Sequence, residues 1–388
     1  MKYTVIFFSS FLFAITTIAG INWFIDPFGM YWSPTVSNIN QQKTEAGTRV
    51  RLVKAYRPAM VNPTVLLVGN SRVEMGLNPQ HPIFAGQTVY NQAMPGAGVV
   101  HQVKYALEVI EKNPDLKQII MGLDILDFFL TYRTDRKLPQ SIQTSSQEWY
   151  EEMHNIAPLL FSLDTFISSL HTITKQGQNA NSINAQGFNT AAGYINIMKY
   201  EGIVVLFQQK YNQLVNQLHK QNYYIEKEVN KSPQLAALTQ LLQETNKRNI
   251  DVQFFINPYH YSYLHILDEA GYWAHFNDWK QLITTFFSDR DTPPTVWDFS
   301  GFNHFTNERL PFEKIHQPMD WYWEPAHYKQ ELGDIILTTM LASSNGPPSF
   351  GQKLTPLTIN DVIKEDRSGL QDTKQQWQKL KQTLLPSG

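Results

Sequence analysis

The chain has 388 residues, of which 42% are hydrophobic and 17% are charged, and its formal net charge at pH 7 is −2. This composition is typical of a globular protein, and it lacks the basic excess with which nucleic-acid-binding proteins attract phosphates. Because the sequence contains no cysteine, disulfides, thiolate metal sites and a cysteine nucleophile are excluded.

The N-terminal segment from Thr4 to Ile25 contains no charged residue. In a helix, these 22 residues span about 33 Å at ~1.5 Å each, enough to cross a hydrocarbon core of about 30 Å. Lys2 precedes the segment and the next cation is Lys43, an asymmetry that places the N-terminus in the cytoplasm. We therefore expect a transmembrane anchor over residues 1–25, with the bulk of the chain on the extracytoplasmic (periplasmic) side.

Two other interpretations of this segment remain open. The small residues around Ala19 also fit the cleavage site of a signal peptide, which would export the protein without retaining the helix. The third interpretation is a buried helix in the core of a globular domain.

The next segments alternate between strand and helix patterns. Residues 26–62 contain several prolines and are interpreted as a juxtamembrane stalk. Short apolar runs, rich in residues that favour β-strands, then predict about five strands buried on both faces, as in a parallel sheet. They lie at residues 64–69, 87–91, 118–124, 250–257 and 295–299. Helical periodicity predicts helices at residues 99–112, 235–248 and 330–341. This alternation predicts a three-layer, flavodoxin-like α/β domain over residues 63–343.

The alternation breaks between about residues 132 and 234. Helical patterns at 164–174 and 200–221 flank a loop rich in Gly, Asn and Gln, and the whole stretch is too long for a simple crossover. We interpret it as a helical insertion that forms a cap beside the sheet. Residues 344–388 are predicted to form a linker and a peripheral helix around Trp377.

Polar residues and glycines follow each predicted strand, at the sheet edge where open α/β proteins carry their sites. They are Ser71 and Arg72 after the first strand, Asn91, Gly96 and Gly98 after the second, Asp124 after the third, Asn257 after the fourth, and Glu324 and His327 beyond the fifth. A serine, a glycine-rich turn, amide side chains and a carboxylate–histidine pair are therefore expected to converge there.

This constellation resembles the SGNH (GDSL-like) hydrolase superfamily. Gly69-Asn-Ser-Arg72 resembles the nucleophile block, Met94-Pro-Gly-Ala-Gly98 the second block, and Glu324-Pro-Ala-His327 the terminal D-x-x-H block with glutamate in place of aspartate. The resemblance covers about residues 63–343 without the insertion. It implies that Ser71 is the nucleophile, that His327 is the general base oriented by Glu324, and that an amide of Gly96 or Gly98 contributes to the oxyanion hole.

These residue types suit acyl-ester chemistry. Serine is a weak nucleophile that needs an adjacent base, and histidine, with an ordinary pKa of about 6.5, takes and returns its proton. A carboxylate three residues earlier fixes the tautomer of the imidazole and stabilises its cation. If Glu324 does not orient His327, Asp298 or Asp320 is the alternative acid.

The third block departs from the family pattern. The family has G-x-N-D, whose asparagine donates into the oxyanion hole, whereas Gly122-Leu-Asp124 puts an aspartate near that position. An ionised carboxylate only accepts hydrogen bonds. Either a side chain among Asn70, Arg72, Asn91 and Asn257 supplies the missing donor, or the oxyanion hole is weaker.

Within the superfamily, the run Trp297-Asp-Phe-Ser-Gly-Phe-Asn303 and the Glu-x-x-His ending resemble the anchored, exported proteins of polysaccharide O-acylation. The resemblance implies hydrolysis or transfer of an acyl group, most simply O-acetyl, on an exported carbohydrate. It also implies the membrane and an envelope acylation machinery as partners, without metal or cofactor. Trp321, Tyr322 and Trp323 either stack on sugar rings or pack the last helix against the sheet.

Two further functions remain open. One is a non-catalytic SGNH-like scaffold that binds polysaccharide or recruits a membrane acyltransferase, which Asp124 favours because it weakens the oxyanion hole. The other is a lipase or thioesterase that acts at the membrane surface beneath the insertion. Reaction with a fluorophosphonate separates an activated serine from a scaffold.

Overall fold

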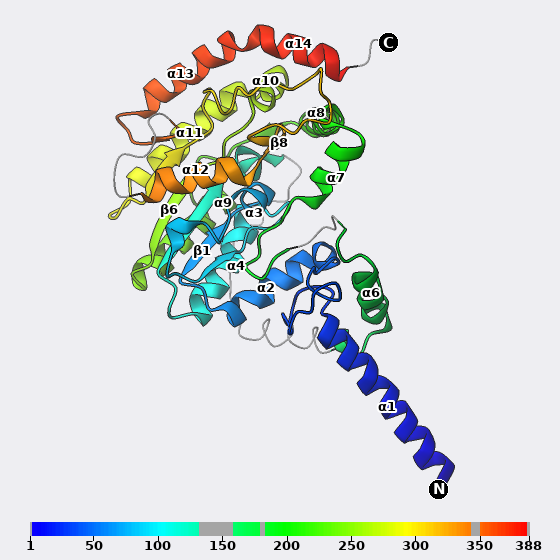
Figure 1. Cartoon of the computed structure of the whole chain (residues 1–388). Helices are drawn as coiled ribbons and strands as arrows, with labels where there is room; N and C mark the ends of the chain where they lie inside the picture. Colours follow the sequence, from blue (N-terminus) through cyan, green and yellow to red (C-terminus); the bar gives the residue numbers. More distant parts are fainter. Residues whose placement is uncertain (1, 132–157, 179–182, 343–349, 386–388) are drawn as a thin grey trace. The chain divides into compact units, whose positions relative to one another are not determined.

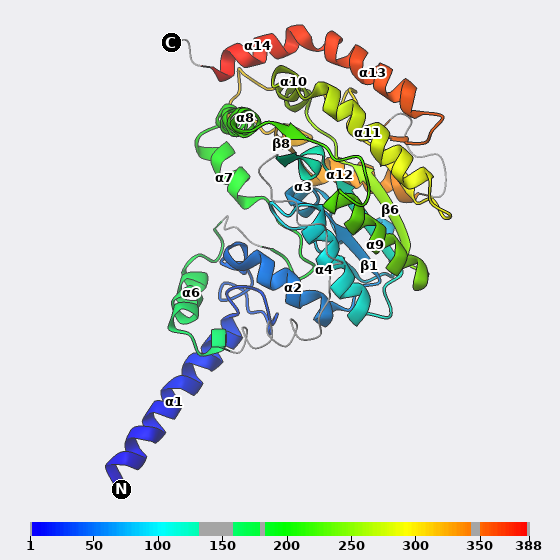
Figure 2. The same ribbon diagram turned by 180° about the vertical axis from the view of Figure 1, so that it is seen from behind.

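The computed structural model describes residues 2–131, 158–178, 183–342 and 350–385, and Figures 1 and 2 show it from opposite sides. Contacts divide the chain into two compact units, which we describe separately. Unit 1 comprises Met1–Val61 and Thr144–Gly193, and unit 2 comprises Asn62–Gln143 and Tyr194–Gly388. The parts of the predicted insertion at 132–157 and 179–182, and of the predicted linker at 344–349, lie outside the described residues.

Unit 2 is built on a six-stranded sheet with the order β10-β7-β6-β3-β1-β2. Its strands are β1 (Val65–Val68), β2 (Val89–Asn91), β3 (Gln118–Leu123), β6 (Asp251–Ile256), β7 (Thr295–Asp298) and β10 (Gln352–Lys353). The first five are parallel to one another, and β10 pairs antiparallel with β7. The predicted mixed α/β fold with a mostly parallel sheet is therefore confirmed, and β10 is an addition that the sequence analysis did not predict.

The central strands are apolar because both faces of the sheet are covered. Leu66 of β1 lies between Tyr90 of β2 and Ile119 of β3, and all three side chains are buried. One face carries α4 (Val99–Lys112) and α9 (Pro233–Lys247), and the other carries α3 (Ser71–Gly76) and α12 (Gln330–Leu341) (Figures 1 and 2).

The helix boundaries follow local signals in the sequence. The side chain of Ser232 accepts a hydrogen bond from the N–H of Leu235, and Pro233 occupies the first turn, so α9 begins there. The three-four spacing of the apolar residues in α4 buries one side of that helix, and Asn113 ends it before Pro114. At its other end, α4 begins after Gly98, one of the predicted site residues.

The C-terminal segment contains more structure than one peripheral helix. It forms α13 (Ile359–Asp372) and α14 (Lys374–Leu384), which pack on α11 (Trp273–Ser288) and α10 (Tyr261–Glu269). Trp377 is buried, its ring stacks on that of His265 at 5.7 Å, and its N–H donates to Glu269 at 2.9 Å. The tail is therefore part of the core of unit 2.

The remaining elements of unit 2 are short, apart from one long helix. They are α8 (Ile203–Lys220), the 3-10 turns η2 (Pro82–Phe84) and η3 (Ile125–Phe128), and the strand pairs β4 (Leu130–Thr131) with β5 (Tyr223–Tyr224) and β8 (Tyr322–Glu324) with β9 (His327–Tyr328). The helix α7 (Ala192–Tyr200) begins at the boundary of the two units.

Unit 1 contains α1 (Lys2–Ile25), the 3-10 turn η1 (Ala46–Arg49), α2 (Val50–Val61) and α6 (Leu163–Thr174). Its small core is formed by Phe28, Met30 and Val53. The helix α1 is long and apolar enough to cross a membrane. Residues of the expected stalk contact α6 of the expected insertion, because Thr44 hydrogen-bonds Thr172 at 3.1 Å.

Candidate active site

Ser71, His327 and Glu324 meet at the carboxyl ends of the strands of unit 2. Ser71 begins α3 directly after β1, and its Oγ lies 2.7 Å from Nε2 of His327. The other ring nitrogen, Nδ1, hydrogen-bonds Oε1 of Glu324, whose Oε2 accepts the N–H of Ala326 at 2.9 Å. The three side chains form a continuous hydrogen-bonded series from a hydroxyl to a carboxylate.

The local sequence explains how the pair reaches the serine. Glu324 and His327 are cross-strand partners in the tight β8–β9 hairpin, so the carboxylate lies against the ring. Glycines allow this hairpin and α12 to approach α3 closely. A Cβ atom on Gly76 would lie 1.9 Å from the ring of Tyr328, and one on Gly333 would lie 1.8 Å from the carbonyl oxygen of Gly76.

The charges around the pair keep the acid ionised and the base neutral. Burial alone would raise the pKa of Glu324, but the charges of Lys210 and His327 and the hydrogen bonds from His327 and Ala326 lower it to about 2. Burial lowers the pKa of His327 below its ordinary 6.5, and Lys210 and Arg72 add to this effect against the opposing pull of Glu324. At neutral pH, Nε2 is therefore free to accept the proton of Ser71 while Nδ1–H donates to Glu324.

Two further residues touch the acid, and the sequence analysis did not find them. The Nζ of Lys210 lies 3.6 Å from Oε1 of Glu324. The hydroxyl of Tyr194 donates to the same oxygen at 3.5 Å and lies 3.1 Å from Nδ1 of His327. Burial, reinforced by the charge of Glu324, raises the pKa of Tyr194 well above 10, so its hydroxyl stays protonated.

A signal for Lys210 exists in the sequence. In α8, it follows the buried Leu206 and Phe207 by four and three positions, respectively, and precedes the buried Leu214 by four. A lysine within the apolar stripe of a helix requires an anionic partner inside the protein. No comparable pattern marks Tyr194.

Arg72 lies inside the protein and joins three parts of the site. Its guanidinium pairs with Asp124 at the end of β3, and its Nε donates to the carbonyl of Ala326 at 2.7 Å. The guanidinium carbon lies 5.0 Å and 5.2 Å from the ring centres of Tyr259 and Tyr263. Arg72 thus links the turn at Ser71, β3 and the β8–β9 hairpin, and the carboxylate of Asp124 is paired with it.

A second network connects the turn at Ser71 to the glycine-rich turn at residues 94–98. Asn70 caps α3 by accepting the N–H of Arg72 at 3.1 Å, and its amide donates to Asp127 at 3.2 Å. Gln102 donates to the same carboxyl oxygen at 3.0 Å and to the carbonyl of Ala97 at 2.6 Å. Burial and the charge of Asp124 raise the pKa of Asp127 to about 8, so this carboxyl group is mostly protonated at pH 7.

The remaining predicted site residues lie at the same edge in different settings. The amide of Asn91 donates to the carbonyls of Val73 and Leu77, and its oxygen accepts the N–H of Ala93. Asn257 donates to the carbonyl of Leu123 and accepts the hydroxyl of Tyr328. Both asparagines are fully buried and bonded at both ends of their amides, which gives them a structural role.

The two glycines border open space. Gly96 has a φ of +65°, and Gly98 caps the N-terminus of α4. A Cβ atom at either position would meet no atom within 4 Å. The predicted role of their amides in an oxyanion hole stays a prediction.

Of the three aromatic residues before Glu324, two pack within the protein and one lies near His327. Tyr322 is buried, and Trp321 packs edge-on against Phe305 at 4.9 Å. Trp323 is half-buried and stacks on Tyr194 at 6.1 Å, and Tyr194 in turn lies 5.6 Å from the ring of His327. Through Tyr194, Trp323 is therefore the member of the run that is connected to the ring of His327.

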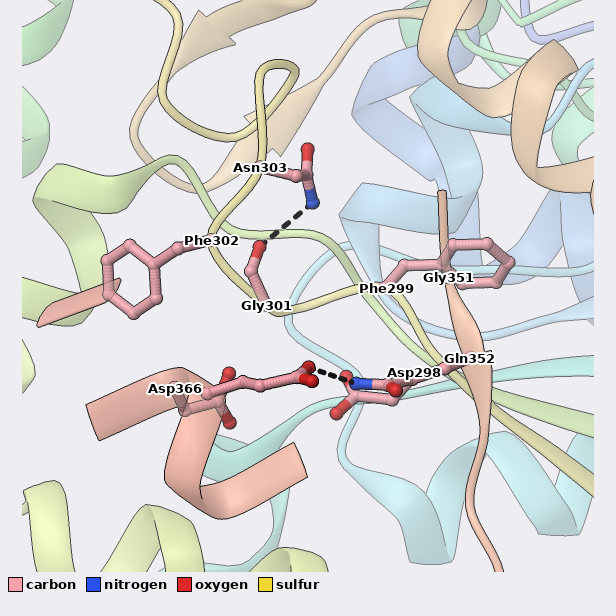
Figure 3. A pocket seen from close by; sticks show the side chains of 9 residues that line it. Asp298, Phe299, Gly301, Phe302, Asn303, Gly351, Gln352 and Asp366 are labelled. Carbon is pink, nitrogen blue, oxygen red and sulfur yellow. Dashed lines mark hydrogen bonds between the residues drawn. The ribbon is translucent and has the colours of Figure 1, made fainter. Parts of the chain in front are cut away.

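A separate cavity of about 240 Å³ lies where β7, β10 and α13 meet (Figure 3). It contains Asp298 and Asp366, and both pair with the buried Lys280. Asp298, one of the two alternative acids for orienting His327, is thus paired with Lys280 instead. The other, Asp320, is exposed and its N–H donates to Glu308.

Within the described ranges, no group of three or more His, Asp or Glu side chains is arranged to hold a metal ion. His260 and His265 instead hydrogen-bond the carbonyl of Glu308 and the hydroxyl of Thr373, at 2.8 Å and 2.9 Å.

Comparison of the chain with family models, with curated proteins and with solved structures gives no match. The functional assignment therefore depends on the geometry described above.

Proposed function

We propose that this chain is an SGNH-like serine enzyme that hydrolyses or transfers an acyl group through a covalent intermediate on Ser71. The observation that carries the proposal is the series Ser71–His327–Glu324, with 2.7 Å between the hydroxyl and the imidazole. The five parallel strands, in the order β2-β1-β3-β6-β7, support it. This is the flavodoxin-like order, which places ligand sites between the first and third strands, where Ser71 and Asp124 lie.

The reaction proceeds in two displacements. Ser71 Oγ attacks the carbonyl carbon of an ester while Nε2 of His327 takes its proton, and the tetrahedral intermediate forms. The intermediate collapses to an acyl-serine, and the leaving alcohol receives the proton from His327. Water or a sugar hydroxyl then gives its proton to His327 and attacks the acyl carbon, which restores Ser71 and releases the acid or the new ester.

The developing oxyanion is assigned to main-chain donors. The N–H of Ser71 and that of Gly96 or Gly98 take this role in the proposal, because Asn91 and Asn257 use their amides elsewhere. In the third block, Asp124 stands near the position of the family's donating asparagine and is paired with Arg72, so the oxyanion hole lacks that side-chain donor. One donor to an oxyanion is worth about 3 kcal/mol, so we expect a slow enzyme.

The substrate class is part of the proposal. Trp323 and Tyr194 form an aromatic pair beside His327, which suits a sugar ring in the acceptor or leaving position. The α1 helix suits a membrane anchor that keeps the bulk of the chain on the extracytoplasmic side, where an exported carbohydrate is met. We therefore propose O-acetyl chemistry on such a glycan.

Labelling with a fluorophosphonate tests the proposal. The purified full-length protein is expected to react rapidly at pH 8 at one serine, Ser71, identified by mass spectrometry. The labelling rate should fall as the pH decreases through the pKa of His327, which burial lowers below 6.5, because the protonated imidazole no longer activates the hydroxyl. Heat-denatured protein is the control. If the native protein stays unlabelled, the serine-enzyme proposal is contradicted and the non-catalytic scaffold is the remaining function.

A second prediction concerns Lys210. Its positive charge lowers the pKa of His327, so in Lys210→Met that pKa rises and the acid limb of kcat/KM moves to higher pH. On that limb kcat/KM should fall severalfold, and it should recover at high pH, where His327 is neutral in both proteins. Lys210→Arg should restore the profile.

The control for this experiment is Lys227→Met, which removes an exposed pair with Asp278. It should leave the profile unchanged. A loss in Lys210→Met that is equal at every pH would contradict an electrostatic role of the lysine.

A further inference from the structure

The α6 helix of unit 1 has three distinct faces. Thr165, Ser169 and Thr172 are buried. The polar residues Asp164, Ser168 and His171 form a second, more accessible face. On the third face, large apolar side chains are 37–63% exposed, namely Leu163, Ile167, Leu170 and Ile173, with Phe161 just before the helix at 55%. Residues 163, 167 and 170 repeat every three to four positions and so lie on one side.

The buried face is attached to α1. The amide of Asn22 donates to the carbonyls of Leu160 and Ser162 at 2.8 Å and 3.1 Å, and its oxygen accepts the hydroxyl of Ser169 at 3.0 Å. Asn22 is fully buried although it belongs to an apolar helix. These hydrogen bonds fix α6 beside the C-terminal half of α1.

The burial pattern of α1 shows how far this contact extends. Every side chain from Lys2 to Ala14 is exposed, whereas Ile15, Ile18, Ala19 and Asn22 form a partly or fully buried stripe. Tyr3 and Trp23, aromatic residues of the type that mark membrane interfaces, are 20 residues apart, or about 30 Å in a helix. The stripe begins eight residues before Trp23, so α6 lies beside the part of α1 that approaches one interface.

We propose that α6 is a second membrane-contacting element whose apolar face inserts into the lipid leaflet at the C-terminal end of α1. Leu163 and Ile167 are 63% and 51% exposed, which approaches the 56–66% of the large apolar side chains between Val5 and Leu12 on α1 that would contact lipid if α1 is an anchor. An apolar face that is bordered by Asp164 and His171 on the side away from the buried face suits a helix that lies at a bilayer surface. The inference depends on the proposed anchoring by α1 and is independent of the chemistry at Ser71.

The absence of cysteine makes a direct test possible. Single-cysteine variants of the full-length chain carry an environment-sensitive fluorophore at Phe8→Cys in α1, at Ile167→Cys or Leu170→Cys on the apolar face, and at His171→Cys on the polar face. The proteins are reconstituted in phosphatidylcholine–phosphatidylglycerol vesicles. Quenching is measured with iodide in the water and with doxyl groups on the lipid chains.

We expect labels at 8, 167 and 170 to be quenched by lipid, with iodide quenching at least threefold weaker than at the matched position 171. If position 8 is lipid-exposed but 167 and 170 are as accessible to iodide as 171, the membrane role of α6 is overturned. If position 8 is also in water, the anchoring premise fails and the inference with it. Neither readout requires catalysis, so an inactive Ser71 would not affect the result.

Discussion

Ser71→Ala is expected to abolish ester hydrolysis and fluorophosphonate labelling while the protein stays folded. Removing the nucleophile of a serine–histidine–acid group typically lowers kcat by ~10⁴–10⁶-fold, because the remaining groups cannot form the acyl intermediate. The side chain of Ser71 hydrogen-bonds His327 and is only partly buried, so the methyl group of alanine leaves no significant cavity.

The measurement is kcat/KM on one acetyl ester, together with probe labelling and circular dichroism. Ser368→Ala, which changes an exposed serine on α13, serves as the matched control and should keep full activity. Labelling that persists in Ser71→Ala, at a different serine, would show that the nucleophile lies elsewhere.

Glu324→Gln is expected to lower kcat/KM by ~10²–10³-fold, somewhat less than the ~10⁴-fold of the acid-to-amide change in the serine-protease template. The amide no longer fixes Nδ1–H of His327 in the productive tautomer. It also removes the charge that raises the pKa of His327 and stabilises its cation, so the imidazole becomes a weaker base. Glu324 has one methylene more than the usual aspartate, which is why we expect the smaller loss.

Glu324→Asp separates charge from geometry. It keeps the carboxylate and should retain more activity than Glu324→Gln, although the shorter side chain lengthens the contacts to His327 and Lys210. Both variants are compared on one acetyl ester after their folding has been checked. If Glu324→Gln is as active as the wild type, the carboxylate does not orient His327, and Tyr194 is the remaining partner of Nδ1.

Much of the fold was predictable because its signals are local. The five parallel strands are short apolar runs, and the predicted bounds of α4 and α12 agree with the structure, since apolar periodicity and the Asn113-Pro114 stop act within a few residues. β10 was not predictable in this way. Its two residues, Gln352 and Lys353, carry no apolar pattern and become a strand only because the edge of β7 lies beside them.

The candidate site was predictable in part. Open α/β proteins carry their sites beyond the carboxyl ends of the strands, and this expectation brings nine residues to one edge of the sheet. It does not say whether a polar group there faces substrate or hydrogen-bonds the main chain. Arg72, Asn91 and Asn257 are bonded within the protein, because buried polar groups at strand ends need partners. Tyr194 and Lys210 are more than one hundred positions from Glu324 in the sequence, so only the tertiary packing of α7 and α8 reveals them.

The position of β10 has a consequence for biosynthesis. The ribosome makes the chain from the N-terminus, so β7 forms more than fifty residues before β10 can cover its outer edge. During that interval the edge presents unpaired main-chain groups, which favours association with a second nascent chain. Truncation just before residue 352 would make this transient state permanent. Pairing of β10, in the last tenth of the polypeptide, therefore completes the sheet. C-terminal fusions that delay the release of this segment from the ribosome should increase aggregation more than fusions at the N-terminus.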